Sequence, residues 1–161
     1  MNRREFLRGR PRSDPSPHRP PWVSAQSLLQ CTSCNACVSA CPESILALDG
    51  AGMPKVDFSN TGCTFCGDCA TACTESVFDH EREPAWRVSL TISDGCLLTS
   101  GVSCQLCTDF CDTDALALDL SQRPVGALRI DQSRCTGCGM CIGACPVTAI
   151  TLTPQTEREA A

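Results

Sequence analysis

The sequence predicts an α+β fold in which one small unit occurs four times, arranged as two tandem pairs behind a basic N-terminal tail. Sixteen cysteines fall into four blocks of similar spacing, and stretches that alternate like strands precede three of the blocks. The 161 residues include only five Phe, two Trp and no Tyr. Because so few aromatic side chains are available for a core, cross-links or metal centres at the cysteines should hold the fold together.

The four cysteine blocks contain every cysteine of the chain. They read CTSCNACVSACP (31–42), CTFCGDCATACT (63–74), CLLTSGVSCQLCTDFCD (96–112) and CTGCGMCIGACP (135–146). Three blocks have the spacing C-x2-C-x2-C-x3-C, whereas the third block lengthens its first gap to seven residues. No cysteine is therefore left over for a separate catalytic role.

The flanking segments repeat with the blocks, and the second cysteines recur every 32–38 residues. PKVDFSNTG (54–62), RVSLTISDG (87–95) and GALRIDQSR (126–134) alternate as half-buried strands do. We predict a helix that starts at each fourth cysteine, with Pro42 and Pro146 in its first turn. The predicted core residues are Ile45, Leu46, Val77, Phe78, Leu116, Leu118, Ile150 and Leu152.

The repeats also suggest domain boundaries. A disordered, basic and Pro-rich tail is expected over 1–25, followed by a first pair of repeats over 26–83 and a second pair over 84–161. The polar segment HEREPAWR (80–87) is the predicted linker between the pairs. Trp22 and Trp86 are expected to pack, and His18 and His80 to be exposed.

The cysteine spacing is typical of bacterial ferredoxins that bind [4Fe–4S] clusters. Three thiolates at intervals of three residues can curl one loop around a cluster, while the fourth reaches a neighbouring cluster. Structural zinc sites instead use two separated C-x2-C pairs, and a disulfide scaffold would not need identical spacing. We therefore expect two tandem 2[4Fe–4S] ferredoxin-like domains, with clusters at the three regular blocks and a fourth at the third block.

Sequential pairing of the blocks predicts four ligand sets of three cysteines plus one. They are Cys31, Cys34, Cys37 with Cys73; Cys63, Cys66, Cys69 with Cys41; Cys96, Cys104, Cys107 with Cys145; and Cys135, Cys138, Cys141 with Cys111. A nested pairing across the linker remains open at this point. Thr74 and Asp112 follow two of the fourth cysteines in place of Pro, so local support there is looser.

Several function classes find no support in the sequence. Residues 21–161 carry a net charge of −9, which argues against nucleic-acid binding by the body of the protein. The sequence contains no run of about 18 apolar residues, so no transmembrane segment is predicted. The chain has no Gly-rich phosphate loop, and with all cysteines assigned no nucleophile set is left. The protein is therefore expected to transfer electrons without being an enzyme.

The N-terminal stretch RREFLRG (3–9) is close to the start of a twin-arginine export signal. Such a signal continues into roughly 7–15 apolar residues, whereas here arginines and prolines follow. We expect the stretch to be retained as a docking tail and the protein to remain in the cytoplasm.

Over nearly its full length the sequence resembles the NapF-type ferredoxin-like proteins of periplasmic nitrate reductase systems. The resemblance is carried by RREFLRGR (3–10), RPPW (19–22), the order of the four blocks and the long gap in the third. It implies a cytoplasmic iron–sulfur accessory protein that acts on the catalytic molybdenum subunit of nitrate reductase before export. It also implies that the cysteines of all four blocks are ligands. A general polyferredoxin electron carrier is the alternative.

Overall fold

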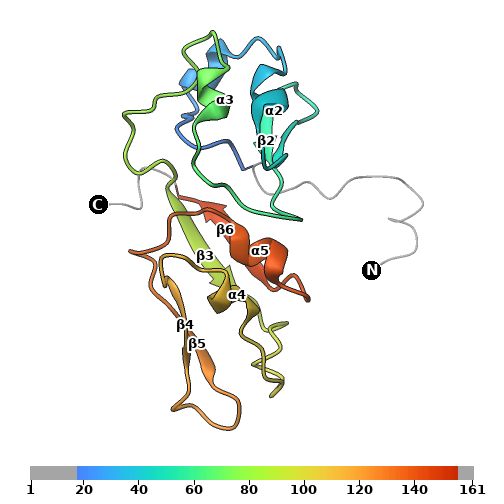
Figure 1. Cartoon of the computed structure of the whole chain (residues 1–161), viewed down its shortest axis with the longest axis vertical. Coiled ribbons are helices and arrows are strands. Elements are labelled where there is room, and N and C mark those ends of the chain that lie inside the picture. The colour runs from blue at the N-terminus through green and yellow to red at the C-terminus, as the bar shows by residue number, and fades with distance from the viewer. Residues whose placement is uncertain (1–17, 156–161) are drawn as a thin grey trace, which may run out of the picture.

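The computed structural model describes residues 18–155, which form two small units placed end to end along the long axis (Figure 1). The stretch 3–9 lies outside the described residues. The first unit contains η1 (Ser27–Gln30), α2 (Ala36–Ala40), β1 (Leu46–Leu48), β2 (Pro54–Val56) and α3 (Asp68–Thr71). The second unit contains β3 (Val88–Ile92), α4 (Leu106–Asp109), β4 (Leu116–Asp119), β5 (Ala127–Ile130), α5 (Met140–Ala144) and β6 (Ile150–Pro154).

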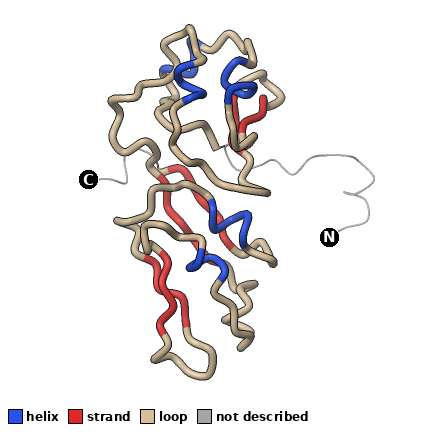
Figure 2. The backbone as a smooth tube through the Cα atoms, viewed as in Figure 1, coloured by secondary structure: helices blue, strands red, loops and turns tan. Residues whose placement is uncertain are grey.

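Both units follow one plan, in which a cysteine loop and a helix precede and follow a β-hairpin. The hairpins are β1–β2 and β4–β5, and both are antiparallel. In the second unit β3 and β6 enclose this arrangement as an antiparallel pair, with Leu90 opposite Leu152. In the first unit a single antiparallel bridge between Val23 and Phe78 takes that place. The strands and the short helices are connected by long loops (Figure 2).

The two hairpins start with the same four residues, LALD, and each turn is stabilised by the aspartate. The Asp49 carboxylate accepts the backbone N–H of Ala51 at 2.9 Å and of Met53 at 3.0 Å. The Asp119 carboxylate accepts the backbone N–H of Ser121 at 3.0 Å. Hydrogen bonds to the charged form lower the pKa of both carboxyl groups. These turns fix the register that brings the cysteine loops of each unit together.

The helices lie before the fourth cysteine of each block, whereas the sequence predicted helices that start at it. Each of α2 and α5 ends at the fourth cysteine of its block, because Cys41 and Cys145 are the C-terminal caps in extended conformation. Pro42 and Pro146 follow the helix ends, where proline is common because it cannot continue a helix. The apolar residues after them form strands in place of the predicted helix.

The core is small and has cysteines at its centre. Six of the eight predicted core residues are buried, while Phe78 and Leu118 are half-buried. The third cysteine of every block is also buried, with 7–8 % of its surface exposed. These are Cys37, Cys69, Cys107 and Cys141. Apolar side chains thus pack around the thiols.

Residues 18–23 belong to the first unit, although the sequence assigned them to the tail. Arg19 forms an ion pair with Asp49 at 2.8 Å, and Pro20, Pro21 and Trp22 are buried. His18 is half-buried and stacks on Trp86 with an interplanar angle of 4°, so the expectation of an exposed histidine was wrong. Burial lowers the pKa of His18.

Leu90 offers a test of this small core. It is 2 % exposed at the middle of β3, whereas Leu120, in the turn between β4 and β5, is 69 % exposed. Leu90→Ala is expected to lower the apparent Tm by roughly 5–15 °C, because removing a buried leucine costs about 2–5 kcal/mol. Thermal unfolding of the metal-loaded protein under anaerobic conditions measures the shift. Leu120→Ala is the matched control and should unfold like the wild type, and equal shifts for both variants would contradict the burial assigned to β3.

Candidate metal centres

Four cavities are each lined by four cysteines, three from one block and one from the block paired with it. Site 1 contains Cys31, Cys34, Cys37 and Cys73; site 2 contains Cys41, Cys63, Cys66 and Cys69. Site 3 contains Cys96, Cys104, Cys107 and Cys145; site 4 contains Cys111, Cys135, Cys138 and Cys141. All sixteen cysteines are free thiols. The structure therefore groups the cysteines as sequential pairing predicts, and not as nested pairing would.

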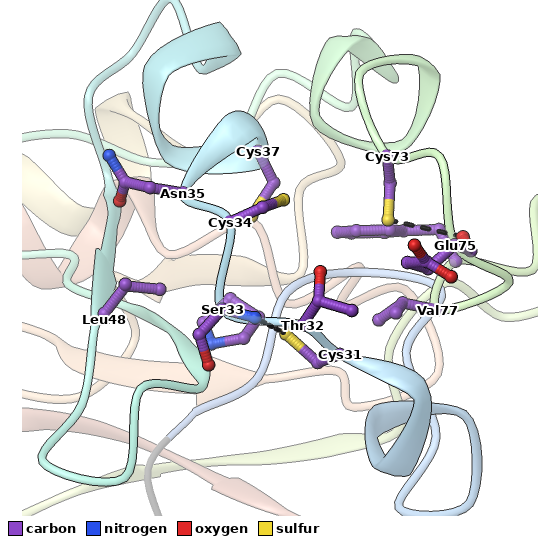
Figure 3. Close-up of a pocket in the computed structure, with 12 residues that line it drawn as sticks. Cys31, Thr32, Ser33, Cys34, Asn35, Cys37, Leu48, Cys73, Glu75 and Val77 are labelled. Atoms are coloured by element: carbon purple, nitrogen blue, oxygen red, sulfur yellow. Dashed lines mark hydrogen bonds between the residues drawn. The ribbon is translucent and has the colours of Figure 1, made fainter.

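Site 1 shows how the secondary structure positions the thiols (Figure 3). Cys31 and Cys34 lie on the loop before α2, and Cys37 lies on α2 itself. Cys73, which follows α3, points toward them from the opposite side of the cavity. Each helix thus supplies one thiol to the site of its own loop, and the cysteine after it supplies a thiol to the neighbouring site.

The loops curl because one residue in each of three blocks adopts a left-handed conformation just before the helix. These residues are Asn35 (φ 66°), Gly67 (φ 82°) and Gly139 (φ 80°), each directly after the second cysteine of its block. Glycine and asparagine are the residues that tolerate this conformation best. The turn brings the third thiol back toward the first two.

Backbone N–H groups approach the thiols of three sites. The N–H of Ser33 lies 3.5 Å from Cys31 Sγ, that of Phe65 lies 3.4 Å from Cys63 Sγ, and that of Ala149 lies 3.3 Å from Cys145 Sγ. Hydrogen bonds to cysteine sulfur stabilise the thiolate and tune a bound iron–sulfur cluster. The sequence does not single out these three donors, because any residue can supply a backbone N–H.

Site 3 closes despite its longer first gap. The inserted residues wind into consecutive turns, in which Thr99 N–H donates to Cys96 O at 3.1 Å and Gly101 N–H donates to Leu98 O at 3.0 Å. Leu98 is buried and lines the cavity. Gln105, which takes the place of the left-handed residue, has φ −141°. The turns thus return the chain so that Cys96 and Cys104 face the same cavity.

Burial in the folded chain raises the pKa of several of these thiols. Desolvation, followed by neighbouring thiols, raises the pKa of Cys69 and of Cys141 to about 12. Desolvation is also the main cause that raises the pKa of Cys63 and of Cys107 to about 11. Four thiolates around one cavity would repel each other, so a cationic group must replace the protons when the thiolates form.

At each site the thiols line a small cavity and are not gathered around one point. Each of sites 1 to 4 encloses about 20 Å³, and each is also open to solvent. A zinc ion holds its thiolate ligands at about 2.3 Å. Among residues 18–155 no three His, Cys, Asp or Glu side chains converge on a position for one metal ion. The four volumes are nearly equal, so site 3 can accommodate the same group as the regular sites.

Comparison with known proteins agrees with this geometry. The ferredoxin-type protein NapF of Escherichia coli K12 is 40% identical over 152 residues, which cover 93% of each chain. The chain belongs to the NapF family of ferredoxin-type proteins. NapF of Haemophilus influenzae is 38% identical over 143 residues, covering 88% of this chain and 81% of that protein.

The family of 4Fe-4S dicluster domains matches the chain twice, at residues 30–77 and 102–149. The two matches fall one in each unit, which supports a tandem arrangement of two iron–sulfur domains. The second match starts after Cys96, so it does not include the first cysteine of site 3. None of the helices in the part of the chain that the structure describes has the length and apolar character to span a bilayer.

Proposed function

We propose that sites 1 to 4 each hold one [4Fe–4S] cluster, with all sixteen cysteines as ligands. The observation that carries this proposal is the convergence of four thiols on each of four cavities of nearly equal volume. A bound cluster supplies reversible one-electron transfer. The chain contributes the thiolates, the backbone N–H donors and the apolar surroundings, which together set the reduction potential.

We further propose that the protein assists the cytoplasmic maturation of the catalytic molybdenum subunit of periplasmic nitrate reductase before its export. Support comes from the NapF family membership and from the basic N-terminal stretch, which contains Arg3, Arg4, Phe6 and Leu7. A basic segment suits an acidic protein surface as its partner. In this role the protein is an electron-transfer accessory factor and not itself an enzyme.

Co-purification tests the proposed partner. Tagged protein isolated anaerobically from the cytoplasmic fraction of nitrate-respiring cells should retain the catalytic precursor of nitrate reductase. Replacement of Arg3 and Arg4 by alanine should reduce the yield of precursor by roughly tenfold, because it removes two of the charges expected to contact the partner. The iron content of the variant serves as the control and should not change. Absence of the precursor, together with normal nitrate reductase activity in a deletion strain, would refute the maturation role.

A general electron carrier of an anaerobic respiratory chain is the second candidate. It is favoured by the presence of four cysteine sites in one chain, which exceeds what a single binding surface requires. Reduced protein that passes electrons at catalytic rates to several unrelated reductases, without binding the nitrate reductase precursor, would favour this function over maturation.

A further inference from the structure

The two units contact each other through the backbone of two cysteine loops. The N–H of Cys63, a residue of site 2, donates to the carbonyl oxygen of Cys138, a residue of site 4, at 2.7 Å. The neighbouring Thr61 hydroxyl lies 3.8 Å from the sulfur of Met140 on α5. The segment before Cys63 therefore lies against α5 and the loop before it, where the first unit meets the second in Figure 1.

Glycines allow this close approach. A Cβ atom on the buried Gly62 would lie 2.5 Å from Cys138 O and 2.6 Å from Met140 N. A Cβ atom on Gly143 of α5 would lie 3.0 Å from the backbone carbon of Asn60. Since real Cβ atoms essentially never approach backbone atoms within 3.0 Å, a side chain at Gly62 would force the loops of sites 2 and 4 apart.

Aromatic side chains close the other side of the same contact. The Trp86 ring meets the ring of Phe65, which lies on the loop of site 2, with centroids 5.5 Å apart. On its other side Trp86 lies about 3.5 Å from the position of a Cβ atom on Gly137, which belongs to the loop of site 4. The Trp86 indole N–H donates to Arg19 O at 2.9 Å and so fixes the ring to the first unit. The predicted linker (80–87) thus contains a side chain, Trp86, that contacts both loops.

We infer that Gly62, Cys63 and Cys138 form a positioning junction that holds sites 2 and 4 side by side, so that the four sites form one row in the order 1, 2, 4, 3. Within each unit the fourth cysteines already join two sites, because Cys41 and Cys73 exchange partners in the first unit and Cys111 and Cys145 do so in the second. The junction places site 2 of the first unit next to site 4 of the second unit. Sites 1 and 3 are then the two ends of the row.

This inference rests on the proposed function only where it concerns clusters, since the junction itself consists of contacts made by the chain. Without it the two units would be two independent pairs of sites on a linker. Electron tunnelling falls steeply with distance, so the separation of sites 2 and 4 decides between one four-site row and two separate pairs. The exposed apolar residues Leu106 and Val147 line site 3 and so lie at one end of this row.

Gly62→Ala tests the junction, and Gly50→Ala is its matched control. Both glycines have φ outside the left-handed region, but a Cβ atom on Gly50 has no atom within 4 Å. In Gly62→Ala we expect the Cys63 amide to exchange its hydrogen roughly tenfold faster, because its hydrogen bond to Cys138 opens more often. We also expect weaker magnetic interaction between clusters in the electron paramagnetic resonance spectrum of the fully reduced protein. Gly50→Ala should match the wild type in both measurements.

Iron and sulfide analysis separates the junction from the proposed function. If Gly62→Ala loses iron, Gly143→Ala replaces it, since a Cβ atom on Gly143 of α5 would lie 3.0–3.1 Å from backbone atoms of Asn60 and Phe58. Unchanged amide exchange and an unchanged spectrum in the variant that retains its iron would overturn the junction. A folded wild type without iron would overturn the proposed clusters, while the difference in amide exchange between the variants would still report on the junction.

Discussion

Removal of iron and sulfide is expected to unfold the protein almost completely. The helices of residues 18–155 contain only four or five residues, and each sheet there has only two strands. Helices shorter than about 12 residues and isolated two-stranded hairpins are marginal in water without tertiary packing. In this fold the packing surrounds the thiols, because Cys37, Cys69, Cys107 and Cys141 are part of the apolar core. Without a group in each cavity the core would be hollow.

The measurement is far-ultraviolet circular dichroism before and after anaerobic treatment with an iron chelator, compared with the same chain after reconstitution. We expect loss of the cooperative thermal transition on chelation and its return with iron and sulfide. Reconstitution should be more complete as the pH rises from 7 toward 9, because the thiols of the unfolded chain have an ordinary pKa of about 8.5 and must lose their protons to bind iron. A chelated protein that retains its spectrum and its transition would show that the apolar contacts alone maintain the fold.

The cysteine blocks made the arrangement of the sites predictable, and local chain geometry explains why. A C-x2-C-x2-C-x3-C run can bring only three thiols to one cavity, so the fourth must serve a neighbour. Sequential and nested pairing were equally compatible with that rule. The choice between them depends on the hairpins, since the β1–β2 turn at Asp49 returns the chain and places Cys63 beside Cys41. Which two cysteine blocks share a site thus depends on the hairpin turn as well as on the cysteine spacing.

The contacts at the N-terminal segment and between the units were not predictable in the same way. His18 and Trp22 lie in a basic, Pro-rich stretch whose composition is typical of disorder. They are ordered by partners far along the chain, since Trp22 N–H donates to Ala85 O at 2.9 Å and His18 stacks on Trp86. Composition within a short window has no information about such partners. The prediction of helices that start at the fourth cysteines was wrong for a different reason. Proline favours both the first turn of a helix and the position just after its end, so Pro42 and Pro146 fit either place.

The sequence and the family comparison say least about whether the third cysteine block holds a cluster. A single substitution in that block has a large expected effect. The match to dicluster domains starts at residue 102 and omits Cys96. In the structure the turns over residues 97–103 return the chain, and Cys96 lines the same cavity as Cys104 and Cys107. If Cys96 is a ligand, the protein holds four clusters. If it is not, the longer gap marks a site that has lost its cluster.

Cys96→Ala decides between these alternatives. We expect the iron content to fall from about 16 to about 12 atoms per chain, as one of four [4Fe–4S] clusters is lost. Retention of a three-iron cluster at site 3, detected by electron paramagnetic resonance of the oxidised protein, would equally identify Cys96 as a ligand. Ser100→Ala, which changes an exposed residue of the same insertion, is the control and should keep the wild-type content. Unchanged iron and no new signal in Cys96→Ala would contradict a cluster held by Cys96. Because the other three sites draw no ligand from residues 97–103, their clusters should persist in both variants.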